Sequence, residues 1–212
     1  MATEIEAKFL ARGPGPLAQL AAADRLGRAS LGPAHAFDEV DRYLDTDDGR
    51  LAAAGWACRL RERAGSMRAS LKGPPDPQGA AWLHHRPEIE APATDSIDPT
   101  DWPPSEAREG IERLSDGRPL HERFRLVQRR TERRVELDDA PIGTLTLDEV
   151  NVRHGDAKAG TLFVVELELA TPTDASSLES LGELAEALAQ RPGLEPDGRT
   201  KLEHAIAMIE ST

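Results

Sequence analysis

Charged residues recur at every second position in several short stretches of this sequence, with apolar residues between them. The first stretch, residues 3–10, would as an extended strand place Glu4, Glu6 and Lys8 on one face and its apolar residues on the other. A single strand of this kind is typical of a sheet with one solvent-facing side. The pattern returns in three more stretches, Arg59-Leu60-Arg61, Glu88-Ile89-Glu90 and Glu166-Leu167-Glu168. This repetition predicts that charged faces from several strands line a shared polar interior.

The rest of the sequence favours antiparallel strands with helices outside them. We expect strands at residues 3–10, 34–44, 56–63, 67–72, 80–91, 120–137, 142–152 and 161–170. A change of register near 128–131 predicts two strands or one bulged strand within 120–137. Helices are expected at 17–26, 50–54, 106–114, 178–188 and 202–209. The proline-rich stretch 92–117 is either a lid or an ordinary surface excursion.

Long alternation of strand and helix is absent from the sequence, which argues against a doubly wound sheet. The expected fold class is therefore α+β, mainly antiparallel β, with a closed barrel and peripheral helices. We expect one domain spanning residues 1–212.

The charge balance limits the partners of this protein. Its 212 residues are 30% charged and carry a formal net charge of -12, which argues against broad electrostatic binding to nucleic acid or to an anionic membrane. A local cluster of Arg and Lys can still bind phosphate. No apolar run approaches the ~18 residues of a membrane helix, and the N-terminus lacks a basic segment followed by an apolar one, so we expect a cytoplasmic protein.

The sequence offers no side chain in the setting of an activated nucleophile. Cys58 is the only cysteine, so it forms no internal disulfide, and the apolar positions on its face favour core packing. His84 and His85 are adjacent and would point to opposite faces of a strand, which favours a surface or loop role over a metal site.

The charged faces need a hydrated, ligand-filled interior, because burying them in a dry core would cost several kcal/mol per ion. Clustered carboxylates bind hard divalent cations such as Mg²⁺ through oxygen. Arg and Lys neutralise phosphate oxygens. Acids and bases together therefore indicate a site for a metal-bound polyphosphate. The candidate acids are Glu4, Glu6, Glu88, Glu90, Asp148, Glu166 and Glu168, and the candidate bases are Lys8, Arg59, Arg61, Lys72, Arg125, Arg130 and Lys201.

The segment Glu4-Ile5-Glu6-Ala7-Lys8 resembles the ExExK signature of the CYTH proteins, also called triphosphate tunnel metalloenzymes. The resemblance continues in order through Leu60-Arg61 with Arg59, Leu71-Lys72, residues 86–90, Arg130, Leu147-Asp148, Glu166-Leu167-Glu168 and Thr200-Lys201. It implies a closed eight-stranded antiparallel tunnel. In such a tunnel a small-molecule triphosphate lies along basic residues, and Mg²⁺ or Mn²⁺ binds to the carboxylates.

The resemblance also implies a role for each matching residue. The residues expected at the catalytic centre are Glu4, Glu6, Lys8 and Asp148. The implied metal ligands are Glu4, Glu6, Glu88, Glu90, Asp148, Glu166 and Glu168. The implied triphosphate contacts are Lys8, Arg59, Arg61, Lys72, Arg125, Arg130 and Lys201. Arg125 and Arg130 have opposite parity, so both can face the tunnel only if a bulge separates them.

These inferences favour a divalent-metal-dependent triphosphatase that removes the terminal phosphate of a short triphosphate. Inorganic triphosphate is the simplest substrate, and thiamine triphosphate is the next. The same tunnel in relatives supports class IV adenylate cyclase, in which the ribose hydroxyl of ATP replaces water as the nucleophile. A catalytically silent polyphosphate-binding module is a third alternative, although binding alone needs only the bases. We expect no nucleic-acid or membrane partner, and either a monomer or a homodimer.

Overall fold

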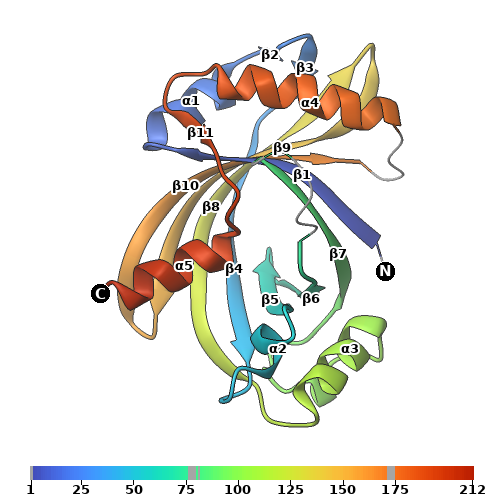
Figure 1. The fold of residues 1–212 in the computed structure, drawn as a ribbon, viewed down its shortest axis with the longest axis vertical. Helices are drawn as coiled ribbons and strands as arrows, with labels where there is room; N and C mark the ends of the chain where they lie inside the picture. Colours follow the sequence, from blue (N-terminus) through green and yellow to red (C-terminus); the bar gives the residue numbers. More distant parts are fainter. Residues whose placement is uncertain (1, 76–79, 81, 171–174) are drawn as a thin grey trace.

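The computed structural model describes residues 2–75, 80, 82–170 and 175–212 of the chain (Figure 1). Eight antiparallel strands within these ranges close into a barrel in the order β4-β5-β6-β7-β1-β10-β9-β8, and β8 pairs in turn with β4. Their bounds are β1 Ala2–Ala11, β4 His35–Asp45, β5 Ala57–Arg63, β6 Ser66–Lys72, β7 Leu83–Pro92, β8 His121–Leu137, β9 Ala140–His154 and β10 Ala157–Leu169. This confirms the closed eight-stranded barrel predicted above.

Shorter strands and helices surround the barrel. The upper part of Figure 1 contains α1 Pro14–Ala22, β2 Arg25–Leu26, β3 Ala29–Leu31, α4 Ala175–Ala189 and β11 Leu194–Pro196. The lower part contains α2 Arg50–Ala53, α3 Glu106–Ser115 and α5 Lys201–Glu210. A short 3-10 helix, η1 Pro99–Asp101, precedes α3 in the chain. The helix expected at 17–26 ends at Ala22, because Leu26 belongs to β2. No helix within the described ranges is long and apolar enough to cross a membrane.

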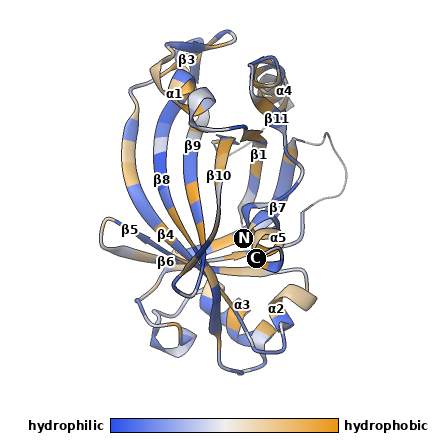
Figure 2. Ribbon diagram, turned by 90° about the vertical axis from the view of Figure 1, so that its left-hand side faces the viewer, coloured by the Kyte–Doolittle hydropathy of each residue, from blue (hydrophilic) through white to orange (hydrophobic). Residues whose placement is uncertain are grey.

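Strand alternation gives the barrel two different faces (Figure 2). The apolar residues of β1, β9 and β10 point outward and pack under α1 and α4, where Phe9, Leu145 and Leu167 are buried. The outer faces of β5 and β6 pack in the same way under α3, with Cys58 and Ile111 in the cluster, as predicted for Cys58. The charged residues of the same strands consequently face the interior.

The bore of the barrel is charged along only part of its length. At the end next to α5, the inward faces of β8, β9 and β10 continue with apolar residues that include Phe124, Val152 and Leu162, and α5 adds Ala205. Tyr43 of β4 stacks on Phe124 with ring centroids 4.8 Å apart. This apolar cluster fills one end of the bore and confines the charged side chains to the remainder.

The register of β8 differs from the sequence prediction. β8 is one strand of 17 residues, and its pairing with β4 and β9 is regular through residues 128–131. The register shifts lie instead opposite residues 43–44 of β4 and at residues 135–136 of β8. Since no bulge separates them, Arg125 and Arg130 face opposite sides of the sheet.

The stretch 92–117 packs on the outside of the barrel. Trp102 and Ile111 belong to the apolar cluster on the outer faces of β5 and β6. None of the described residues that line the central cavity comes from this stretch. The structure therefore favours a packed surface excursion over a lid.

Candidate functional site

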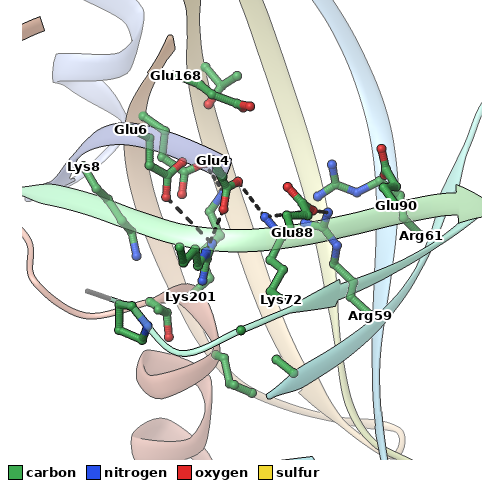
Figure 3. A pocket seen from close by; sticks show the side chains of 18 of the residues that line it. Glu4, Glu6, Lys8, Arg59, Arg61, Lys72, Glu88, Glu90, Glu168 and Lys201 are labelled. Atoms are coloured by element: carbon green, nitrogen blue, oxygen red, sulfur yellow. Dashed lines mark hydrogen bonds and ion pairs between the residues drawn. The ribbon is translucent and has the colours of Figure 1, made fainter. Parts of the chain in front are cut away.

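The charged strand faces enclose a cavity of about 650 Å³ inside the barrel (Figure 3). This volume lies within the range of about 300–1,000 Å³ that is usual for small-molecule sites. The charged lining residues are Glu4, Glu6, Lys8, Arg59, Arg61, Arg63, Lys72, Arg86, Glu88, Glu90, Arg130, Glu132, Glu166, Glu168, Lys201 and Glu203. The cavity lining thus includes the site residues predicted from the sequence, with two exceptions, Arg125 and Asp148.

Arg125 lies on the outer face of β8. Its side chain is 44% exposed, and its Nε donates a hydrogen bond to Glu122 at 2.6 Å. The prediction that Arg125 contacts the triphosphate is therefore wrong. The physical reason is the regular pleat of β8, which sends Arg125 outward when Arg130 points inward.

Glu4 lies between two cations. Its carboxylate oxygens accept hydrogen bonds from Lys72 Nζ and Arg86 Nε, each at 2.6 Å. Burial alone would raise the pKa of Glu4, but the two cations outweigh this effect and lower the pKa to about 2. Lys72 Nζ also lies 3.2 Å from Glu88. Glu4 is therefore ionised and already compensated.

Glu6 and Glu168 lack this compensation. They are cross-strand partners in β1 and β10. Arg86, at 3.9 Å, is the one described cation within 4.0 Å of Glu6, and Glu168 has no such cation among the described residues. Burial and the carboxylates of Glu166 and Glu4 raise the pKa of Glu6 to about 8, and burial also raises the pKa of Glu168. These two adjacent carboxylates, the buried Glu6 and the more exposed Glu168, are weakly compensated by the described cations and form an electrostatic site for a cation.

A divalent cation fits this pair of carboxylates chemically. Carboxylate oxygens are the ligands that Mg²⁺ and Mn²⁺ prefer, and Glu4 and Glu166 place further oxygens nearby. The described residues contain no group of three or more Asp, Glu, His or Cys side chains already arranged around a metal position. A bound cation would therefore need the carboxylates to move closer, or water to complete its ligand shell, as is usual for Mg²⁺.

Asp148 is fully buried behind the wall of the cavity. It accepts hydrogen bonds from Arg130 Nε at 2.8 Å and Nη2 at 2.6 Å, and from Lys201 Nζ at 2.6 Å. Burial would raise the pKa of Asp148, but Arg130 and Lys201 outweigh it and lower the pKa. The sequence predicted a metal ligand here. The observed partners are cations, so the structure favours a role in fixing Arg130 and Lys201.

Two acids on β4, Glu39 and Asp41, were missed by the sequence reasoning and are buried inside the barrel. Arg61 donates to both oxygens of Asp41 at 2.6 Å and lies 3.1 Å from Glu39. Gln128 Nε2 donates to both acids, at 2.7 and 2.8 Å. The signal for them was the same charged alternation, Glu39-Val40-Asp41, in a stretch already expected to be a strand. Together they fix the guanidinium of Arg61 at the cavity wall.

Two lining residues carry buried polar atoms that lack a hydrogen-bond partner within the described part of the chain, Arg59 Nε and Thr146 Oγ1. The opposite side of the Arg59 guanidinium donates to Ser70 Oγ at 3.0 Å and lies 3.6 Å from Asp41 and Glu88. Buried polar groups are normally hydrogen-bonded, so each exception needs an explanation. Because both atoms have almost no accessible surface, a ligand in the cavity reaches them only if neighbouring side chains move. A search for charged patterns does not find the uncharged Thr146.

Lys8 and His84 both contact Asp197, the residue just before the loop that leads into α5. Lys8 is 1% exposed, donates to the backbone oxygen of Arg199 and lies 3.4 Å from the Asp197 carboxylate. His84 is 3% exposed, so the expectation of a surface or loop position was wrong. β7 begins at Leu83, so His84 lies within the strand, and its pairing with Glu6 of β1 places it on the inward face. Burial lowers the pKa of His84.

The family of the chain follows from comparison with known proteins. The family model described as the CYTH domain matches residues 2–203. The chain belongs to the CYTH domain family. This confirms the resemblance carried by its sequence motifs. A search of curated proteins finds no significant match.

Solved structures share the fold of this CYTH protein. A putative adenylyl cyclase from Hippeastrum, described as having a dominant triphosphatase activity, has a TM-score of 0.66 and 22% identity, over 96% of this chain and 95% of that one. A putative adenylate cyclase from Bacillus halodurans has a TM-score of 0.59 and 18% identity, over 96% and 98%. Another, from Vibrio parahaemolyticus, has a TM-score of 0.57 and 16% identity, over 96% and 97%. These distant likenesses show a common fold, and the reaction must be argued from the site.

Proposed function

We propose that this CYTH protein is a divalent-metal-dependent hydrolase that cleaves the terminal phosphate from a short triphosphate. Inorganic triphosphate is the simplest substrate, with thiamine triphosphate next. The observation that carries the proposal is that one cavity contains both carboxylates short of counter-cations and an arginine donor without an acceptor. Among the described residues, Glu6 has only Arg86 within 4.0 Å, at 3.9 Å, and Glu168 has no cation that close, while the buried Nε of Arg59 has no acceptor. A metal-bound polyphosphate meets both needs, because it brings cation and anion together.

Glu6 and Glu168 would hold the metal, with Glu4 and Glu166 beside them. When bound, Mg²⁺ or Mn²⁺ would neutralise phosphate charge and help to place the attacking water. The sequence expected Asp148, Glu88 and Glu90 in the same role. Asp148 already accepts hydrogen bonds from Arg130 and Lys201, and Glu88 lies 3.2 Å from Lys72. We therefore propose that Asp148 and Glu88 hold basic residues in place. Glu90 is 3.1 Å from Arg68, which also directs it toward a cation.

The basic residues would bind the phosphates and stabilise the charge that develops during cleavage. Arg130 and Lys201 are held from behind by Asp148, and Arg61 is held by Asp41. Cations fixed in this way need little reorganisation when the phosphoryl group transfers, which is the main electrostatic contribution an enzyme can make to this reaction. Arg59 adds a guanidinium whose buried Nε has no acceptor among the described residues.

Water is the nucleophile that the site favours. Cys58 is packed outside the barrel, and burial raises the pKa of its thiol to about 12, so it stays protonated. The carboxylates of the cavity can accept a hydrogen bond from water and orient it toward the terminal phosphorus. This leaves the charge-stabilising cations to assist the departing diphosphate.

The test is an assay of products with each candidate substrate. Purified protein is incubated with inorganic triphosphate, thiamine triphosphate or ATP, with Mg²⁺, Mn²⁺ or EDTA, and phosphate, pyrophosphate and cyclic AMP are measured. We expect phosphate release from a triphosphate that stops with EDTA. Cyclic AMP as the main product would replace the hydrolase with a cyclase, and binding without turnover would indicate a binding module.

Matched variants connect the activity to the site. Glu168→Gln removes a charge but keeps the shape of the side chain, and we expect it to abolish metal-dependent turnover. Glu195→Gln is the control, because Glu195 is 60% exposed and pairs with Arg12 on the surface. Equal activity of the two variants would contradict the assignment of Glu168 to the metal.

A further inference from the structure

Asp197 lies where the beginning and the end of the chain meet. It stands between β11 and α5 and is only 6% exposed. Lys8 of β1 and Lys201 of α5 lie near it in the fold, and both line the cavity (Figure 3). Asp197 itself is absent from the residues lining the cavity within the described part of the chain, so its burial needs another explanation.

The carboxylate of Asp197 has three different partners. Its Oδ1 accepts a hydrogen bond from the backbone N–H of Arg199 at 3.0 Å. His204 Nε2 lies 3.0 and 2.9 Å from its two oxygens, and Lys8 Nζ lies 3.4 Å from Oδ2. Because an ionised carboxylate only accepts hydrogen bonds, Nε2 of His204 must carry a proton. Asp197 thus links a lysine of β1 to a histidine of α5.

The backbone of Asp197 strengthens the same link. Its N–H donates to the carbonyl oxygen of Lys8 at 3.0 Å. Its own carbonyl accepts a hydrogen bond from His84 Nε2 of β7 at 2.8 Å. The Lys8 ammonium also donates to the carbonyl of Arg199. The segment before α5 is therefore fixed to both β1 and β7.

This segment determines where α5 begins. Thr200 caps the helix: its Oγ1 accepts from the N–H of Glu203 at 3.2 Å, and the Glu203 carboxylate accepts from the Thr200 N–H at 2.7 Å. Lys201 is the first residue of the helix and reaches Asp148 and Glu166 at 2.6 and 2.7 Å. A shift of the segment would carry Lys201 with it.

We propose that Asp197 and His204 are positioning residues for triphosphate binding, which hold Lys8 and Lys201 at one end of the cavity. This inference rests on the proposed function of the same site. The ammonium of Lys8 has three N–H donors, so its contacts with Asp197 and Arg199 leave one for a phosphate oxygen. Without Asp197, the ammonium loses a counter-charge and the segment that carries Lys201 loses its anchor.

Asp197→Asn separates positioning from simple turn formation. Asparagine keeps an oxygen that can accept from the Arg199 N–H, but it removes the charge beside Lys8. We expect inorganic triphosphate to bind about 10- to 100-fold more weakly by isothermal titration calorimetry, in line with the cost of a displaced binding group. The neighbouring control Glu195→Gln, on the exposed Arg12 pair, should bind as the wild type does. Wild-type affinity in a folded Asp197→Asn protein would overturn the proposal.

A pair of variants at His204 provides a second test that does not depend on how Asp197→Asn folds. Gln in place of His204 keeps an N–H donor for Asp197, whereas Leu removes it. We expect His204→Gln to retain the triphosphate affinity and KM of the wild type. His204→Leu should bind triphosphate about tenfold more weakly and have an about tenfold higher KM, with a smaller change in kcat. Equal KM values in the two variants would contradict the inference, and a lower thermal unfolding temperature of His204→Leu beside equal KM values would show a merely structural role.

The binding measurement also separates this inference from the proposed function. Wild-type protein that binds inorganic triphosphate without hydrolysing it would refute the hydrolase, and the Asp197→Asn affinity would still judge the positioning role. Hydrolysis by wild type with unchanged binding in both Asp197→Asn and His204→Leu would refute the positioning role alone. A wild type that binds no triphosphate would refute both.

Discussion

Replacing Glu6 by Gln should stabilise the metal-free protein at neutral pH. Glu6 is 4% exposed, and burial together with Glu166 and Glu4 raises its pKa from 4.5 to about 8. The folded protein therefore holds a proton that the unfolded chain releases between these two pH values. Because the folded pKa is the higher one, the contribution of Glu6 to stability is fully present below pH 4.5 and is lost as the pH rises through 8.

The magnitude follows from this interval. Each pH unit between 4.5 and the folded pKa lowers the free energy of unfolding by about 1.4 kcal/mol. At pH 7 the burial of Glu6 therefore lowers the free energy of unfolding by about 3 kcal/mol. Glutamine has the shape of a protonated glutamate and never ionises, so it avoids the penalty. Glu6→Gln should therefore raise the free energy of unfolding by about 3 kcal/mol at pH 7 and by almost nothing at pH 4.5. In a chain of this size, 1 kcal/mol corresponds to about 2–4 °C in Tm.

The assay is chemical unfolding followed by circular dichroism at pH 4.5, 7 and 8.5, with EDTA present to exclude metal. Glu195→Gln, on the surface, is the control for a lost glutamate charge. The same Glu6→Gln protein should be inactive toward triphosphate, because the metal site has lost a ligand. If its gain in stability were the same at all three pH values, or became a loss at pH 7, Glu6 would be ionised and compensated in the fold and our view of the site would be refuted.

Three further substitutions test the basic residues and the helix cap. In steady-state kinetics, Arg130→Gln should raise KM for inorganic triphosphate by about 10- to 100-fold, because it removes charge-assisted hydrogen bonds. The control is Arg129→Gln, at the neighbouring side chain that is 57% exposed, and its kinetics should match the wild type. Arg133→Leu should lower the free energy of unfolding by about 3 kcal/mol or more in denaturant titrations, because it leaves five buried or half-buried backbone acceptors without their donor; unchanged stability would contradict this reasoning. Thr200→Ala should cost about 1 kcal/mol in thermal unfolding through loss of the capping box, and a Tm equal to wild type would contradict it.

The faces of the strands could be predicted from the sequence because the pleat is a local property. Glu4, Glu6 and Lys8 share a face whatever lies beside β1, and the same holds for Arg59 and Arg61 on β5. Four such stretches, with turn signals between them, were enough to predict a barrel with a polar bore. The apolar outer residues then identify which faces the helices must cover.

Register and partner choice were harder to predict, because they depend on contacts between strands. The sequence of β8 is rich in arginine on both faces, so alternation alone could not say that Arg130 points inward and Arg125 outward. The inward direction of Arg130 is set by its pairing with Asp148 on the neighbouring strand β9, and the uninterrupted register then turns Arg125 outward. Asp148 shows the same limit: its residue type suggested a metal ligand, whereas its neighbours make it the anchor of two cations.

The distribution of compensated and uncompensated charge separates what holds this barrel together from what it binds. Acids such as Asp41 and Asp148 make bidentate contacts with arginine, which offsets the cost of burying both partners. Within the described part of the chain, Glu6 has only Arg86 nearby, at 3.9 Å, and the Nε of Arg59 has no hydrogen-bond acceptor in the same cavity. An anion alone would satisfy Arg59 and increase the repulsion at Glu6, and a cation alone would do the reverse. A ligand that carries both charges therefore fits the cavity best, which is the physical basis of our proposal of a metal-bound polyphosphate.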